Sequence, residues 1–109
     1  MTDEARDLLR DEVLQALRMV IDPELGENLV DLGLIYGVDV DDGGGVRIAM
    51  STTTKGCPAT AYLKDAVHSA AAFVEGVERV EVRLTYDPPW SPDMIGASIR
   101  PAFRSVGGG

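Results

Sequence analysis

Apolar residues recur every three or four positions near the start of the chain, and this spacing predicts an amphipathic helix over about residues 3–21. Thr2 can cap its first turn. Pro23 ends it, because proline disfavours helical backbone in the residue before it. The apolar stripe consists of Leu9, Val13, Ala16, Leu17 and Val20. One face of this helix should therefore pack into the core.

Two later segments, residues 32–40 and 46–50, alternate apolar and polar positions, which is typical of strands with one buried face. Their inward sets are expected to be Leu32, Leu34, Tyr36, Val38 and Val40, then Val46, Ile48 and Met50. Residues 41–45 between them end in three glycines, which adopt turn conformations at no steric cost. We expect an antiparallel hairpin.

The second half of the chain predicts a helix over residues 58–74, a strand over 77–86 and a short last helix over 92–100. Ser91 and Pro92 suit the cap and first turn of that last helix. The order helix, strand, strand, helix, strand, helix indicates an α+β two-layer sandwich, with a three-stranded sheet covered by helices on one face. We expect one domain over residues 1–109, with its core at about 6–101 and a mobile tail at 102–109.

Composition excludes several classes of function. The 109 residues carry a net charge of −8, and their ten basic residues are scattered among eighteen acidic ones, which argues against a nucleic-acid partner. No apolar run approaches the roughly 20 residues of a membrane helix, and the acidic N-terminus lacks a signal-peptide layout. A single cysteine cannot form an intrachain disulfide. We expect a cytoplasmic protein.

The only cysteine, Cys57, lies between the second strand and the second helix. Pro58 at the first helical position would place Cys57 at or beside the N-cap, where the helix dipole and nearby Lys55 would favour a thiolate. A thiolate can bind a metal or attack an electrophile. The competing interpretation is a small buried residue that only packs.

A distance and a ligand count limit the reactions and metal sites in which Cys57 could take part. The only histidine, His68, lies eleven residues further along the same predicted helix, about 16 Å away, so a Cys–His catalytic pair is out of reach. A closed zinc or iron–sulfur site needs four ligands, and the chain has two Cys or His residues in total. Cys57 could hold a cluster only across a dimer or with external ligands.

Two loops offer further candidate residues. Asp22 and Glu24 flank Pro23 and could border a binding surface, although a structural role in the turn is the stronger interpretation. Pro89 and Trp90 could form an exposed partner surface, although a tryptophan more often packs.

Four sequence blocks together resemble the SufT/PaaD-like family of iron–sulfur cluster assembly domains, from about Val13 to Arg100. They are Val20-Ile21-Asp22-Pro23-Glu24, Asn28-Leu29-Val30-Asp31-Leu32-Gly33-Leu34-Ile35-Tyr36, Thr52-Thr53-Thr54-Lys55-Gly56-Cys57-Pro58 and Asp87-Pro88-Pro89-Trp90-Ser91-Pro92. The resemblance implies the fold of cluster-assembly domains and a role in iron–sulfur protein maturation. It also implies that Cys57 is a reactive or ligand residue near the acidic loop. PaaD-type members carry an additional cysteine-rich segment, so the standalone SufT-like branch fits better.

The resulting hypothesis is a non-enzymatic factor that assists cluster assembly or transfer to client apoproteins. Cys57 would ligate iron or a labile cluster between the subunits of a homodimer, or contact a client. Thr54, Lys55 and Gly56 would shape its pocket, and Asp22 and Glu24 would border it. One alternative is a metal-free adaptor that binds clients through the Pro89 and Trp90 region. Another is a maturation subunit of a phenylacetyl-CoA oxygenase-type system.

Overall fold

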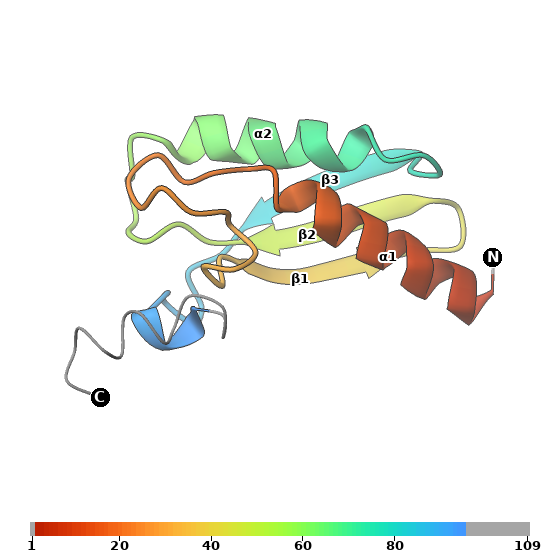
Figure 1. Cartoon of the computed structure of the whole chain (residues 1–109), viewed down its shortest axis with the longest axis horizontal. Helices are drawn as coiled ribbons and strands as arrows, with labels where there is room; N and C mark the ends of the chain where they lie inside the picture. The colour runs from red at the N-terminus through yellow and green to blue at the C-terminus, as the bar shows by residue number, and fades with distance from the viewer. Residues whose placement is uncertain (1, 96–109) are drawn as a thin grey trace.

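The computed structural model describes residues 2–95, which fold into two layers (Figure 1). The elements are α1 (Asp3–Leu17), β1 (Ile35–Val40), β2 (Gly45–Met50), α2 (Thr60–Ala72), β3 (Arg79–Leu84) and the 3₁₀ helix η1 (Pro92–Met94). Buried residues of both helices join those of the sheet in one core, so the helices cover the same face. The predicted α+β class and order of elements are confirmed.

Helix α1 is capped as expected, but it ends earlier than predicted. The hydroxyl of Thr2 accepts a hydrogen bond from the Ala5 N–H at 3.1 Å, and Leu9, Val13 and Leu17 are buried. The helix stops at Leu17 and not at residue 21, because the next residues pair with a later part of the chain. The Leu29 N–H donates to the carbonyl of Val20 at 3.0 Å. Val20 is still buried in the core, but from a loop.

The sheet has the order β1-β2-β3, with β1 antiparallel and β3 parallel to β2. The predicted hairpin is therefore confirmed. β1 begins at Ile35 and not at Leu32, because residues 28–33 form turns, with the Leu32 N–H bonded to the carbonyl of Asn28. Leu32 and Leu34 are buried nonetheless. α2 makes the crossover that a parallel β2–β3 pair requires.

Helix α2 begins at Thr60, two residues later than predicted, with Ala59 as its N-cap and no capping side chain. The expectation that Cys57 lies at or beside the N-cap is therefore wrong. The Cys57 carbonyl accepts bonds from the N–H and the hydroxyl of Thr60, and these bonds close a separate turn before the helix. In β3 the predicted alternation holds, since Arg79, Glu81 and Arg83 are exposed and Val80, Val82 and Leu84 are partly buried.

The last described segment folds back against the loop before β1. Ser91 is the N-cap of η1, although its side chain makes no capping bond, and Ile95 is 1% exposed in the core. Gly33, with φ of +76°, lies so close to Met94 that a Cβ on the glycine would overlap the Met94 carbonyl oxygen. The rest of the predicted last helix and the tail at 102–109 lie outside the described residues. Within residues 2–95, no helix is both long and apolar enough to cross a membrane.

Candidate functional site: Cys57 and the acidic loop

The loop between α1 and β1 is held in shape by Asp22. Its carboxylate is 2% exposed and accepts hydrogen bonds from the N–H groups of Glu24 and Leu25 at 2.8 and 3.1 Å. The backbone of Asp22 bonds to Glu27 and Gly26, which closes the loop on itself. The structural role that the sequence favoured for Asp22 is thus what the geometry shows, and this role fixes the backbone of Glu24.

Glu24 is the acidic residue that meets the cysteine. The Cys57 thiol donates a hydrogen bond to Oε1 of Glu24 at 3.2 Å. Cys57 is 7% exposed, whereas Glu24 is an exposed residue on the rim. The buried sulfur therefore lies beside an oxygen of an exposed carboxylate.

The surroundings of the thiol act against ionisation. The backbone N–H of Ala59 is the largest single influence and lowers the pKa of Cys57. The bond to Glu24, burial and the charges of Glu24 and Asp22 together outweigh it and raise the pKa above its ordinary value. The predicted depressed pKa is therefore wrong, because the charges that act on the thiol are the carboxylates of Glu24 and Asp22.

The three residues before Cys57 form a bend on the surface. Thr54, Lys55 and Gly56 are all exposed, and Gly56 has a φ of +74°. The Lys55 ammonium lies 5.6 Å from the centroid of the Tyr86 ring, a distance at which a cation–π attraction operates.

Tyr86 and Thr52 support this bend, and nothing in the sequence indicates that they contact each other. The Thr52 hydroxyl donates to the Thr54 carbonyl at 2.7 Å, which leaves it to accept from the Tyr86 hydroxyl at 2.8 Å. Thr52 is 1% exposed. In the sequence Tyr86 is the last residue of the strand predicted over 77–86, and that position does not identify its partner.

The other candidates lie elsewhere. His68 is exposed on α2, as its position in the predicted helix indicated. Trp90 is partly buried against the core, and its indole N–H donates to the Leu32 carbonyl at 2.7 Å, while Pro89 is exposed. Among residues 2–95, no three His, Cys, Asp or Glu side chains gather closely enough to hold a metal ion.

Comparison with known proteins identifies the family. The family model described as "Iron-sulfur cluster assembly protein" matches residues 10–84, which include both loops of the site. The chain belongs to this family. The resemblance to SufT/PaaD-like proteins is thereby confirmed, and the function is an accessory one in iron–sulfur protein maturation.

Two curated relatives and one solved structure are similar along most of their length. The chain is 40% identical to the Fe-S protein maturation auxiliary factor YitW of Bacillus subtilis, covering 82% of this chain and 87% of that one. It is 43% identical to the auxiliary factor SufT of Staphylococcus aureus, covering 71% and 88%. A domain of unknown function from Bacillus anthracis superposes with a TM-score of 0.87 at 30% identity, covering 94% and 97%. Both of these curated relatives are named as maturation auxiliary factors.

Proposed function

We propose that Cys57 and Glu24 form half of a site that holds iron or an iron–sulfur cluster briefly while it passes to client apoproteins. The observation that carries this proposal is the 3.2 Å contact between the thiol and the Glu24 carboxylate. A thiolate and a carboxylate are both ligands that iron accepts. Membership of a cluster assembly family supplies the cargo that these two ligands would meet.

The number of ligands explains why the cargo would be labile. An iron–sulfur cluster is usually held by four protein ligands, and one copy of the pair supplies two. Two copies of the chain facing each other would supply four, so we infer a homodimer as the holding state. A client cysteine can replace one of these ligands during handover, because the site is shared and includes an exposed carboxylate.

The raised pKa of Cys57 suits transient binding. The thiol must lose its proton before the sulfur can ligate iron, so binding releases a proton and weakens as the pH falls. Glu24 accepts the thiol hydrogen in the metal-free protein and is positioned to turn its oxygen toward the cargo afterwards. The same two residues would thus stabilise both the empty and the loaded site.

Anaerobic reconstitution with ferrous iron and sulfide tests this assignment. We expect the wild-type protein to acquire cluster absorbance, Cys57→Ser to lose it, and Glu24→Gln to release its cluster faster to a chelator. Glu12→Gln, which removes an exposed carboxylate from α1 away from the loop, is the matched control and should behave as wild type. Normal client maturation in cells that carry only Cys57→Ser would refute the role of Cys57.

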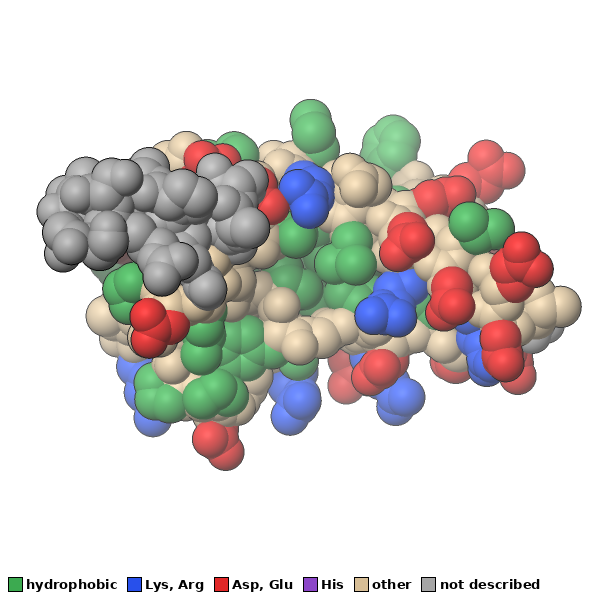
Figure 2. Space-filling view, turned by 60° about the horizontal axis from the view of Figure 1, so that its bottom comes forward, with side chains coloured by type: hydrophobic (Ala, Val, Ile, Leu, Met, Phe, Trp, Pro, Cys, Tyr) green, Lys and Arg blue, Asp and Glu red, His purple; other side chains and the backbone are tan. Residues whose placement is uncertain are grey.

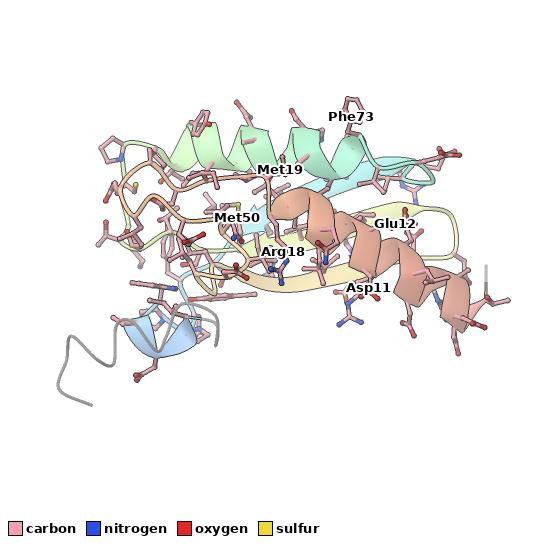
Figure 3. All side chains as sticks on the ribbon, viewed as in Figure 1. Asp11, Glu12, Arg18, Met19, Met50 and Phe73 are labelled. Atoms are coloured by element: carbon pink, nitrogen blue, oxygen red, sulfur yellow. The ribbon has the colours of Figure 1, made fainter. Side chains whose placement is uncertain are left out.

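A metal-free adaptor remains the second candidate, and an apolar groove between the helices favours it. Met19 is 80% exposed and Phe73 is 91% exposed, and both line a hollow of about 390 Å³ with Ala16, Ser69 and Ala70. Figure 3 shows Phe73 pointing away from the sheet at the end of α2. Exposed methionine and aromatic side chains are enriched at protein interfaces.

The two candidates differ in which variant loses client capture. An adaptor predicts that Phe73→Ser abolishes pull-down of a client apoprotein while Cys57→Ser leaves it intact. A cluster donor predicts that Cys57→Ser blocks maturation even where capture persists. Replacement of exposed Pro89 by alanine tests whether the segment beside Trp90 also contacts clients. In both cases we place the protein in the cytoplasm with the assembly machinery, acting without enzymatic turnover.

A further inference from the structure

β1 lies at one edge of the sheet, and its hydrogen-bond pattern shows which peptide groups face outward. The Asp41 N–H donates to the Gly45 carbonyl at 2.9 Å, so these two residues form a hydrogen-bonded pair at the start of the ladder. Such pairs alternate along antiparallel strands, so Asp39 and Gly37 also turn their peptide groups toward β2. The N–H and C=O groups of Val38 and Val40 therefore point away from the sheet.

These outward N–H and C=O groups are not hydrogen-bonded to any other described segment. Among residues 2–95, the backbone groups of Val38 and Val40 make no hydrogen bond with a turn, loop or helix. Unpaired N–H and C=O groups in a row are a template on which another strand can add. The β1 edge thus has the main-chain chemistry of a strand-addition site.

A hollow lies on each side of this edge. One, of about 370 Å³, separates it from α1 and is bordered on the helix side by Arg6, Asp7 and Arg10. The other, of about 410 Å³, lies on the uncovered face of the sheet and is bordered by Arg47 and Arg83. Successive side chains of an added strand would enter the two hollows in turn. Figure 2, which is turned toward this side of the molecule, shows basic side chains interspersed with acidic ones over the face.

The row of residues that crosses the uncovered face from Gly37 ends in a positive charge. Gly37 pairs with Ala49, and Ala49 pairs with Arg83, so no large side chain separates the edge from the guanidinium. In the neighbouring row Arg47 lies between Asp39 and Glu81.

The arginines of this region differ in their ion pairing. Arg6, Arg18 and Arg79 are in ion pairs with aspartates. Within residues 2–95, Arg10, Arg47 and Arg83 have no carboxylate oxygen within 4.0 Å. Three arginines without an ion pair in this part of the chain therefore lie beside the β1 edge, among the carboxylates of Asp7, Asp39 and Glu81 that line the same hollows.

We propose that the β1 edge binds an extended segment of a partner protein by strand addition, and that this segment carries an acidic side chain directed toward Arg83 and Arg47. Main-chain bonds to Val38 and Val40 provide the affinity, and the arginines select the acidic side chain. This surface is separate from Cys57, so the proposal does not depend on cluster binding.

The alternative occupant is a second copy of the chain, and Asp39 disfavours it. A two-fold pairing that uses Val38 and Val40 of both copies would be centred on Asp39. That register places two Asp39 carboxylates directly opposite each other, and like charges in this position are destabilising. The β-bulge between Ile35 and Gly37 further limits the length of edge that can pair with itself.

A nuclear magnetic resonance titration tests the proposal, with a synthetic polythreonine peptide that carries a single central glutamate as the probe and the same peptide with lysine in place of the glutamate as its control. We expect saturable shifts of the Val38 and Val40 amides with the acidic peptide at millimolar concentration. Arg83→Ala should weaken binding by about two- to fivefold, as loss of an exposed ion pair does. Arg79→Ala, which removes a charge already paired with Asp41, should not weaken it. Absent shifts, or equal binding of the lysine peptide, would overturn the proposal.

Val40→Pro provides an independent test of the main-chain bonds. Proline removes the outward N–H of Val40 but no donor of the β1–β2 ladder, so the sheet should keep its dispersed amide spectrum. Peptide binding should fall at least tenfold. If sedimentation instead shows a wild-type dimer that Val40→Pro dissociates, the edge belongs to a second copy and the partner assignment is wrong. The Arg83→Ala and Arg79→Ala comparison decides the matter if the proline variant does not fold.

Discussion

The sulfur of Cys57 lies 3.2 Å from Oε1 of Glu24, although 33 residues separate them along the chain. The contact joins the loop that follows α1 to the loop that precedes α2. Neither loop carries a periodic pattern, so only the folded arrangement of the two helices over the sheet brings these two residues together. This contact is one of the influences that raise the pKa of the thiol.

Replacement of Glu24 by glutamine should make Cys57 more reactive at neutral pH. The variant keeps a side chain of similar size but removes a negative charge that raises the pKa of the thiol. The rate of alkylation by iodoacetamide, followed against pH, should show a midpoint above the value of about 8.5 for free cysteine in wild type. Its midpoint should be lower in Glu24→Gln. Identical midpoints would show that the carboxylate does not control the thiol.

The same raised pKa has a consequence for stability. The folded chain favours the protonated form of Cys57, and this preference stabilises the fold at pH values below the pKa of the unfolded chain. The stabilisation is lost as the pH rises through the higher pKa of the folded chain. Chemical denaturation at pH 7 and pH 10 should therefore show a smaller alkaline loss of stability in Cys57→Ser than in wild type.

Asp22→Ala should destabilise the fold by about 1–3 kcal/mol, because two backbone N–H groups lose a buried acceptor. Asp22→Asn keeps a side-chain oxygen that can accept the same bonds, so it should lose less. Urea denaturation measures both variants. If asparagine is as damaging as alanine, the charge of Asp22 matters more than its bonds to the loop.

Gly33→Ala and Gly26→Ala separate steric contact from backbone strain. Both glycines have positive φ, but a Cβ on Gly33 would overlap the Met94 backbone, whereas a Cβ on Gly26 meets nothing within 4 Å. We expect a loss of about 1–2 kcal/mol for Gly26→Ala from strain alone, and a larger loss for Gly33→Ala. Trp90 fluorescence should change only in Gly33→Ala, because η1 must move to make room for the added Cβ. Equal losses of stability would mean that Met94 can move away from the added Cβ with no loss of free energy.

Trp90→Phe tests whether the tryptophan is structural. The variant retains an aromatic ring but leaves the buried Leu32 carbonyl without its indole donor, so it should lose about 1–3 kcal/mol of stability. Pro89→Ala, next to it on the surface, should lose little. A Trp90→Phe variant that is fully stable but no longer captures clients would assign Trp90 to a partner surface instead.

The sequence predicts the order and type of the elements well because each has a periodic apolar pattern. Leu9, Val13 and Leu17 lie on one side of α1, and Val80, Val82 and Leu84 alternate with arginine and glutamate in β3, as expected. The ends of elements are harder to predict. Val20 continues the helical spacing but bonds to Leu29, a distant residue that no local pattern reveals.

The sequence suggests which residues belong to the candidate site, but it does not predict the electrostatics around the thiol. The family resemblance brings Cys57 and the acidic loop to attention, and the structure distinguishes Asp22, which holds the loop, from Glu24, which touches the sulfur. The pKa of Cys57 moves in the opposite direction to the prediction because Glu24 comes from a different loop. The bond of Tyr86 to Thr52 is missed for the same reason.

The self-closed acidic loop also bears on how quickly cargo could leave. Because the backbone around Asp22 is fixed by its own hydrogen bonds, Glu24 can break its contact with the sulfur by rotation of its exposed side chain, without opening of the loop. Rotations of exposed side chains take picoseconds to nanoseconds, whereas loop opening takes far longer. Handover would then be timed by the arrival of a client and not by a conformational change of the protein that delivers.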